Sequence, residues 1–412
     1  MMTATVVGGL LGYLFHFVVS RQLSVSQYGE LQSLLSLSII FGVFNSALSY
    51  FAVKYASVFA AHDDRAANLG FSDYFTSKIF KFAGILLVVL IISSPILSRL
   101  LHFSSYLGFF VISFATFISA MAIIYSEILR GWQEFVLLSL IGIITAVTKL
   151  VSGAVLACLS HKASVVSFSF LAIALINWYL MKRWYRKKIA NAENPDNSID
   201  WKEKYFPEAN AKKTVVSIFF FSLALILVSN LDVVLVKYFS SAEMTGRYGA
   251  FALIGKIVLW LNLSVVGVML PGAIADGHSG KRPEKHDLLK SYGLTTFIAL
   301  GLISAYYLMP NFITNIFFGK KYVLDTQVLW MFGLMSYLLS ILTLEANLSF
   351  AKHDFRVVYF LAATIFLMIG SLAKYHASLE QIVLAMSASF LLGYFSVTML
   401  NLSHEKTKKI NS

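Results

Sequence analysis

The sequence predicts an all-α polytopic membrane protein with twelve transmembrane helices in two six-helix bundles. Of its 412 residues, 58% are apolar and only 13% are charged, and the mean hydropathy is +0.73. Soluble domains carry about a quarter charged residues. A short pattern ending in Tyr-Gly occurs at Tyr28 and again at Tyr248, 220 positions later, and the same offset carries Glu134-Phe135 onto Asp354-Phe355. A repeat at this distance indicates a duplicated bundle.

Each element is an uninterrupted apolar stretch of roughly 20 residues, long enough to cross about 30 Å of hydrocarbon. In chain order, the predicted spans cover residues 3–20, 31–53, 79–98, 106–129, 136–159, 164–181, 214–237, 249–271, 291–309, 326–349, 356–373 and 380–402. The first six form an N-terminal bundle over 1–181, and the last six form a C-terminal bundle over 214–402. The longest polar stretch predicts a cytoplasmic linker over 182–213, and residues 403–412 form a cytoplasmic tail.

The distribution of Lys and Arg predicts the orientation, because basic residues are retained on the cytoplasmic side during insertion. With a cytoplasmic N-terminus, 23 of the 33 basic residues fall in inside loops and the tail, and eight fall in outside turns. Lys149 and Lys256 lie within spans. We therefore expect both termini in the cytoplasm. The same distribution accounts for the net charge of +12, so we expect no nucleic-acid partner.

The sequence lacks motifs for enzyme chemistry. No pair of His or Cys residues has metal-ligand spacing, and no phosphate-binding loop is present. Gly8, Gly9 and Gly12 lie inside the first span, where they favour contact between helices. The outside turns are short, so no extracytoplasmic domain is expected to hold an active site. We expect a protein that is not an enzyme and has no catalytic residue, cofactor or metal.

Two signatures and one turn resemble the pattern of a known family. They comprise the Ser24 to Gly29 segment after the first span, the Leu129 to Phe135 turn between the fourth and fifth spans, and a set around the seventh span made up of Asp232, Leu235, Tyr238, Phe239, Ser240, Gly246, Tyr248 and Ala250. Together they resemble the polysaccharide-type flippases of the multidrug/oligosaccharidyl-lipid/polysaccharide (MOP) exporter superfamily. The sequence departs from this pattern at its short first span and at the second signature, where three extra residues separate Ser241 from Tyr248.

The resemblance implies a MATE-like architecture, with two bundles around a central cavity and alternating access. It implies movement of undecaprenyl-diphosphate-linked oligosaccharide from the inner to the outer leaflet of the bacterial cytoplasmic (inner) membrane. Such transport serves the synthesis of O-antigen in lipopolysaccharide, of capsule or of exopolysaccharide. The expected partners are the lipid-linked oligosaccharide, membrane lipids, H+ or Na+ as a coupling ion, and the glycan polymerase and glycosyltransferases of the same pathway.

A substrate with two phosphates requires polar stripes and buried cations along its path. Four spans carry polar residues at helical spacing. The second span has Ser38, Gly42, Asn45 and Ser49, the fifth has Thr145, Thr148, Lys149 and Ser152, the seventh has Ser222, Ser229 and Asp232, and the tenth has Ser336, Ser340, Thr343 and Asn347. Hydroxyls alone are better explained by close helix packing. Lys149 differs, because a charge at mid-depth costs about 2.5–3.5 kcal/mol unless it is paired or hydrated. We expect Lys149 to attract the diphosphate.

Six further charged residues, at the ends of the spans, are candidates. Lys256 lies about 10 Å from the outer edge of the eighth span and either lines the cavity or snorkels to the surface. Asp232, near the outer end of the seventh span, is an interfacial group, a partner of Lys256 or an ion-coupling residue.

The other four charged candidates lie at inner ends. Glu345 and Glu127 occupy the inner ends of the tenth and fourth spans. Each is a candidate for taking up a proton during coupling, although carboxylates at a cytoplasmic end are more often solvated. Lys54 and Arg130 are topology determinants that are also candidates to meet the substrate's phosphates at the cytoplasmic entry.

Two other functions stay open. A MATE-like multidrug or cation antiporter would favour a cavity dominated by acids. In this sequence the charged candidates deep in the spans are two lysines, Lys149 and Lys256, and one acid, Asp232. A polytopic glycan polymerase or ligase also handles undecaprenyl-linked sugars. It would carry a substantial outside loop with basic residues or histidines, and the short outside turns argue against it.

Overall fold

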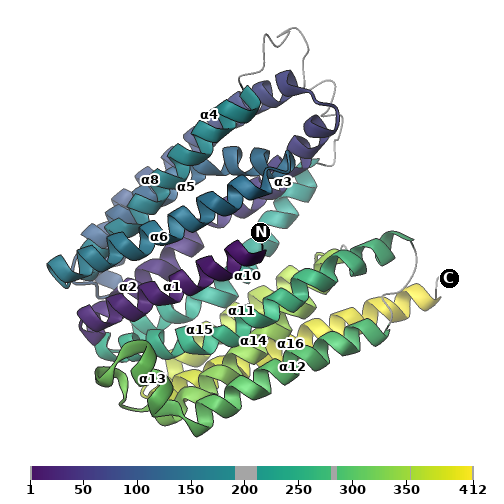
Figure 1. Cartoon of the computed structure of the whole chain (residues 1–412). Coiled ribbons are helices and arrows are strands. Elements are labelled where there is room, and N and C mark those ends of the chain that lie inside the picture. The colour runs from purple at the N-terminus through teal and green to yellow at the C-terminus, as the bar shows by residue number, and fades with distance from the viewer. Residues whose placement is uncertain (1, 191–210, 280–284, 353, 411–412) are drawn as a thin grey trace. The chain divides into compact units, whose positions relative to one another are not determined.

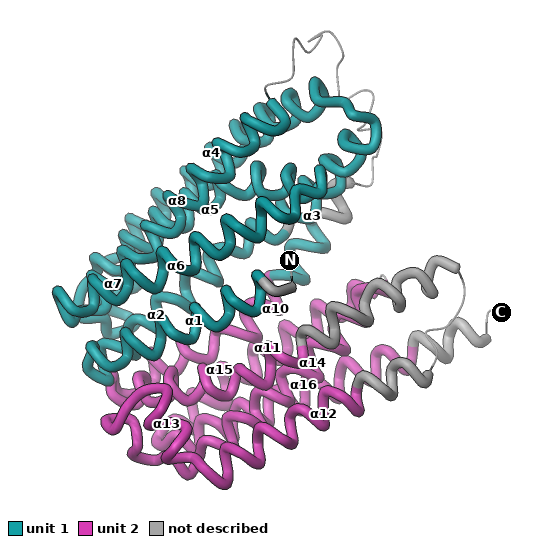
Figure 2. The backbone as a smooth tube through the Cα atoms, in the orientation of Figure 1, with its two compact units in different colours: residues 1–222 teal, residues 223–412 magenta. Residues whose placement is uncertain are grey.

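The computed structural model describes residues 2–190, 211–279, 285–352 and 354–410, and every regular element within them is a helix. The chain divides into two compact units, residues 1–222 and residues 223–412 (Figure 2). The division falls inside one helix, a few residues after the predicted start of the second bundle at 214. Most of the predicted linker over 182–213 lies outside the described residues.

The first unit is built around one central helix, α5 (Figure 1). The elements of its first 190 residues are α1 (Met2–Gln22), α2 (Val25–Phe41), α3 (Val43–Ala61), α4 (Arg65–Leu100), α5 (Leu107–Gly131), α6 (Phe135–Ser160), α7 (Ala163–Val166), α8 (Phe168–Tyr185) and the short π-helix η1 (Arg186–Ala190). Helix α5 packs against α3, α4 and α8, while α1 packs lengthwise against α6.

The second unit repeats this plan around α14. The helices of this part of the chain are α10 (Ala211–Phe239), α11 (Ala242–Ser279), α12 (Lys285–Leu308), α13 (Pro310–Phe318), η2 (Lys320–Tyr322), η3 (Thr326–Val328), α14 (Leu329–Ala351), α15 (Val357–Lys374) and α16 (Leu379–Ile410). Helix α14 packs against α11, α12 and α16. Helices α5 and α14 correspond to the fourth and tenth predicted spans, so duplicated positions have the same structural role.

The outer surfaces of the helices are apolar. Nine described helices are long and apolar enough to cross a membrane, and the number rises to eleven if each of two bent helix pairs is one span. Large apolar side chains such as Phe82, Ile92, Val136 and Phe366 are each at least 70% exposed. Hydrocarbon accommodates such a surface, whereas soluble proteins rarely expose one. The predicted all-α membrane class is confirmed.

Several predicted boundaries differ from the structure; helix α4, for example, begins at Arg65, 14 residues before the predicted span over 79–98. The second span, 31–53, consists of two helices, α2 and α3, that meet at Gly42 with a bend of 41°. The sixth span, 164–181, is interrupted at Ser167, between α7 and α8. Helical structure then continues to Ala190, eight residues beyond the predicted start of the linker at 182. It continues because Tyr185 and Ile189 are buried in the apolar core of the first unit.

Candidate functional site

The duplicated signature has the same local structure in both units. Ser24 and Ser241 each precede the first residue of a helix, and each hydroxyl accepts a hydrogen bond of 3.2 Å from the backbone N–H three residues later. Both serines therefore cap a helix N-terminus. The three extra residues before Tyr248 add nearly one turn to the start of α11, because a helix has 3.6 residues per turn. The Tyr248 side chain therefore lies on the same face of α11, toward the preceding helix, as the Tyr28 side chain does on α2.

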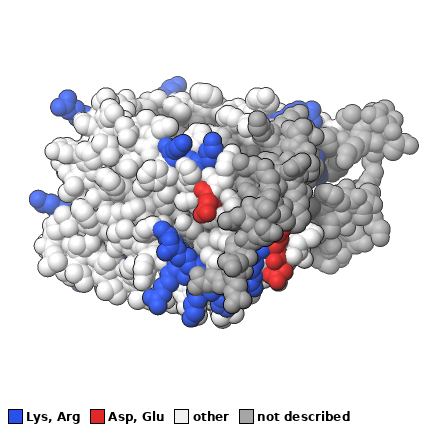
Figure 3. All heavy atoms as spheres, turned by 90° about the horizontal axis from the view of Figure 1, so that it is seen from above, with Lys and Arg blue, Asp and Glu red and all other residues white. Residues whose placement is uncertain are grey.

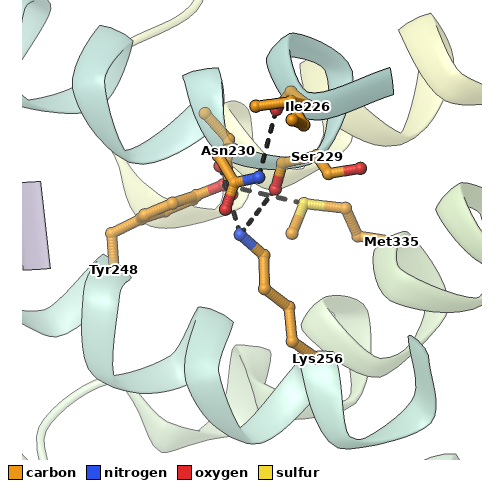
Figure 4. A network of polar contacts seen from close by, with 7 residues as sticks. Ile226, Ser229, Asn230, Tyr248, Lys256 and Met335 are labelled. Carbon is orange, nitrogen blue, oxygen red and sulfur yellow. Dashed lines mark hydrogen bonds and ion pairs between the residues drawn. The ribbon is translucent and has the colours of Figure 1, made fainter. Parts of the chain in front are cut away.

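In the second unit, Tyr248 belongs to a buried charged network between α10 and α11 (Figure 4). Its hydroxyl donates to Asp232 Oδ2 at 3.0 Å and lies 3.8 Å from the Met335 sulfur of α14. The Lys256 ammonium donates to Asp232 Oδ1 at 3.3 Å and to the Ser229 carbonyl oxygen at 2.8 Å. The side chain of Asp232 is 3% exposed and that of Lys256 is 14% exposed. The lysine is therefore an internal partner of Asp232, which is one of the arrangements that the sequence left open.

In the first unit, Tyr28 belongs to a neutral network at the same place. Its hydroxyl pairs with His16 Nδ1 of α1 at 3.1 Å and accepts a hydrogen bond of 2.8 Å from the Gln32 amide. All three residues are buried. Each duplicated tyrosine thus joins the signature helix to the preceding helix, but the partner is His16 in one unit and Asp232 in the other.

Lys149 lies on the side of α6 that packs against α1. Its ammonium lies 4.7 Å from the centroid of the Phe15 ring. Gly153, one turn further along α6, leaves the room for that ring, because a Cβ at this position would lie 2.2 Å from Phe15 Cε2. Within the described part of the chain, no carboxylate lies at ion-pair distance from Lys149. Its contact with the Phe15 ring is therefore with an aromatic face and not with a carboxylate.

The hydroxyls predicted to share the stripe with Lys149 are bonded to their own helix. Thr145 donates to the Gly142 carbonyl at 2.9 Å, Thr148 to Ile144 at 2.8 Å, and Ser152 to Thr148 at 2.5 Å. In the second span, Asn45 lies in the first turn of α3, just after the bend at Gly42, and its backbone N–H donates to the Gly42 carbonyl. These contacts are those of residues that ease helix packing and bending.

Both inner-end glutamates are buried and partnered. Glu127 is 2% exposed, and its carboxylate lies 3.0 Å from Arg130, which is half exposed. The acid proposed for coupling and the cation proposed for substrate entry therefore form one pair. Lys54, on α3, is exposed and lies 5.9 Å from the ring centroid of Tyr55.

Glu345 lies where α12, α14 and α16 meet. The Tyr292 hydroxyl of α12 and the Asn401 amide of α16 donate to its two carboxylate oxygens. Asn401 in turn accepts a hydrogen bond of 2.7 Å from Ser349. This carboxylate is buried and held by two donors from different helices, whereas the sequence favoured a solvated carboxylate at this position.

A buried polar contact lies between the Asp232 network and the Glu345 network of the second unit. The Asn262 amide of α11 donates to Ser340 Oγ of α14 at 3.0 Å, and Asn262 is 1% exposed. Gly255, two turns earlier on α11, allows the two helices to come close, because a Cβ there would lie 2.7 Å from the Phe332 carbonyl oxygen. Helices α11 and α14 are thus joined by backbone contact and by a buried amide.

The predicted inner turns carry paired charges. Glu134 and Asp354, which the 220-residue offset superimposes, contact Lys188 at 3.1 Å and Arg356 at 2.7 Å. The hydrogen bonds and charge of Asp354 raise the pKa of the Arg356 guanidinium.

Aromatic and basic residues alternate at the end of α8 and in η1. Lys182 and Lys187 lie 5.0 Å and 4.9 Å from the ring centroids of Trp178 and Trp184. Figure 3 shows one face of the molecule, on which most side chains are neutral and Lys and Arg gather in a few groups. Aromatic and basic residues at a helix end are typical of the membrane interface on the cytoplasmic side.

Several residues of these networks could not be assigned from the sequence. His16, Tyr292 and Asn401 belong to no repeated spacing of polar residues. Lys237, counted with the outside turns, is buried at 1% exposure. Tyr28 and Tyr248 could be identified from the sequence, because they belong to the repeated signature, but the repeat does not predict the hydrogen-bond partner of either hydroxyl.

Comparison with models of protein families and with the sequences of curated proteins gave no match. Among solved structures, the chain is similar to an inward-facing multidrug resistance MATE family transporter of the MOP superfamily, with a TM-score of 0.69, 11% identity, and coverage of 97% of this chain and 96% of that one. It is similar to the lipid II flippase MurJ in an inward closed conformation, with a TM-score of 0.67, 16% identity, and coverage of 97% and 86%.

A third similar structure is the MATE multidrug transporter DinF-BH, with a TM-score of 0.61, 14% identity, and coverage of 96% and 92%. At these identities the likeness concerns the fold. The chain therefore has the all-helical two-bundle fold of these transporters over nearly its whole length.

Proposed function

We propose that this protein is a flippase that moves undecaprenyl-diphosphate-linked oligosaccharide from the inner to the outer leaflet of the bacterial cytoplasmic membrane. Its proposed role is in the synthesis of O-antigen, capsule or exopolysaccharide. The fold is that of transporters, and one of the similar structures is a lipid II flippase. The observation that carries the proposal is the ammonium of Lys149, which has no carboxylate at ion-pair distance in the described residues.

The energetics of Lys149 favour an anionic ligand. A lysine at mid-depth costs about 2.5–3.5 kcal/mol on insertion scales. Contact with an aromatic face returns about 0.5–2 kcal/mol, depending on how far the pair is removed from water. About 0.5–3 kcal/mol therefore stays uncompensated within the described contacts, and a bound diphosphate or water would offset it. Lys256 carries no comparable excess, because Asp232 compensates its charge.

The proposal assigns the other candidates by their contacts. Lys54 and Arg130 meet the phosphates at the cytoplasmic entry, where both side chains reach the surface. The hydroxyls of Thr145, Thr148 and Ser152 shape the α6 face around Lys149.

The test is transport of a radiolabelled lipid-linked oligosaccharide between the leaflets of vesicles that contain the purified protein. We expect Lys149→Met to lower the transport rate more than tenfold, which corresponds to about 1.4 kcal/mol, and Lys149→Arg to retain part of it. Lys162→Met, at an exposed outer turn, is the matched control and should transport at the wild-type rate. Unchanged transport by Lys149→Met would contradict the role of Lys149, and no transport by the wild type would contradict the flippase.

For ion coupling we propose that Glu345 exchanges a proton, because it is buried yet held by hydroxyl and amide donors that suit both of its protonation states. Glu127 is the corresponding candidate in the first unit. Glu345→Gln keeps the shape of the network, so we expect a folded protein whose transport no longer responds to a pH gradient. A Glu345→Gln variant with an undiminished response would rule out this role.

A multidrug cation exporter is the second candidate, since two of the similar structures are multidrug transporters. The same vesicles, loaded with a cationic dye, separate the two functions. Dye efflux in the absence of glycolipid movement would favour the exporter.

A further inference from the structure

The Lys256 ammonium lies in an environment of oxygen atoms. It is 2.8 Å from the Ser229 carbonyl oxygen and 3.3 Å from Asp232 Oδ1, both on α10 (Figure 4). The other carboxylate oxygen of Asp232 accepts the Tyr248 hydroxyl at 3.0 Å. A carboxylate and a backbone carbonyl one turn apart are hard oxygen ligands of the kind that bind small cations. The ammonium therefore occupies the position that a monovalent metal ion would take at these oxygens.

This arrangement is specific to the second unit. Before the three-residue insertion, Ser24 pairs with Ser241 at an offset of 217, so Asp232 corresponds to Phe15; after the insertion the offset is 220, and Lys256 corresponds to Ser36. The first unit therefore has neither charge at this place. The tyrosine is kept, but there its partners are neutral. The second unit thus has both the acid and the lysine and the first unit has neither, as expected if each is tolerated in the membrane only with the other.

The aliphatic part of the Lys256 side chain lies within the packed second unit, so the ammonium reaches Asp232 from inside the protein. The side chain is 14% exposed, and Gly255 beside it lies against the backbone of Phe332. The start of the stem is therefore fixed by close helix contact, and the charge at its end is tethered to the chain.

We propose that Lys256 is a tethered cation that fills a monovalent cation site formed by Asp232 and the Ser229 carbonyl. With the lysine removed, the same oxygens bind Na+ or K+ from solution. With the lysine in place, the site takes no metal ion, so the wild-type fold needs no Na+ or K+ there. This inference goes beyond the proposed flippase, because it concerns cation binding and stability and holds for any transported substrate.

The experiment measures thermal unfolding of the purified full-length protein in detergent, with NaCl or KCl titrated against choline chloride at equal ionic strength. For the wild type, we expect the Tm to be the same in all three salts. For Lys256→Ala, which removes the stem and leaves room for an ion with water, we expect a lowered Tm in choline chloride and a saturable rise of several degrees with Na+ or K+. The double variant Asp232→Asn/Lys256→Ala should lose this rise, because the carboxylate is gone.

The outcomes divide cleanly. A cation-specific rise in Lys256→Ala that disappears in the double variant supports the tethered cation. Equal Tm values for Lys256→Ala in all three salts overturn it. This holds also if lowering the pH raises the Tm of Lys256→Ala, because a proton and not a metal ion then neutralises Asp232. If Lys256→Ala does not fold, Lys256→Ser, whose short side chain also leaves room for an ion with water, takes its place with the same expectations. Failure of both variants to fold even in NaCl or KCl also overturns the proposal, because it predicts that these ions restore the site. The readout involves no transport, so it is independent of the flippase test.

Discussion

At the residue scale, Tyr28 and Tyr248 show how one side chain keeps its place while its chemistry changes. Both are fully buried, and both follow a capping serine at the start of a signature helix. Tyr28 bonds to the neutral groups of His16 and Gln32, whereas Tyr248 bonds to the Asp232 carboxylate. A hydroxyl both donates and accepts, so it tolerates either neighbour.

Removal of the Tyr248 hydroxyl should be costly, because a hydrogen bond to a charged group contributes about 1.5–3 kcal/mol. We expect Tyr248→Phe to lower the free energy of unfolding by about that amount and to lower the Tm measurably in detergent. Tyr307→Phe is the control, because the Tyr307 side chain is 67% exposed. This variant should unfold at the wild-type temperature. Equal Tm values for Tyr248→Phe and the wild type would mean that the Asp232 carboxylate does not depend on this donor.

At the element scale, glycines set how closely helices approach. A Cβ at Gly255 would lie 2.7 Å from the Phe332 carbonyl oxygen, which is backbone and cannot rotate away. We expect Gly255→Ala to push α11 from α14 and to cost about 1–3 kcal/mol. Gly142→Ala is the matched control on α6, where a Cβ meets nothing within 4 Å. There alanine should be neutral or stabilising by up to about 1 kcal/mol. Thermal unfolding of the two variants side by side checks this; a Gly255→Ala variant as stable as Gly142→Ala would contradict the close approach.

The elements themselves could be predicted well from sequence, for a physical reason. In hydrocarbon each backbone N–H and C=O must bond within the protein, and a continuous apolar run of about 20 residues meets this requirement as a helix. The same rule says nothing about where a helix bends, and the break at Gly42 inside the 31–53 span was missed. Partners across helices were also missed, because Glu345 meets Tyr292 and Asn401 from 53 and 56 residues away, and no spacing pattern records such a contact.

At the scale of the whole molecule, a duplicated scaffold carries charges that are not duplicated. Helices α5 and α14 hold the centre of their units in the same way. The offset pairs Lys149 of the first unit with Ile369, and Lys256 of the second with Ser36. In the first unit the lysine lies over an aromatic ring, and in the second it is compensated by an acid. We therefore expect the two units to contribute differently to one asymmetric substrate, with the first supplying the attraction for an anion.

Orientation in the membrane is a property of the whole chain, and the Lys and Arg distribution predicts it: both termini lie in the cytoplasm. Cys158 is the sole cysteine and is first replaced by Ser. A single cysteine introduced into a turn then shows, by its labelling, on which side of the membrane that turn lies. Lys162→Cys lies at the turn between α6 and α7, and Asp63→Cys at the turn between α3 and α4; both positions are exposed. We expect a membrane-impermeant maleimide to label Lys162→Cys in intact cells and to label Asp63→Cys only after the cells are opened. The reverse pattern would place the proposed entry residues Lys54 and Arg130 outside, where a lipid-linked precursor made in the cytoplasm never meets them, and the proposed direction of transport would then fail with the topology.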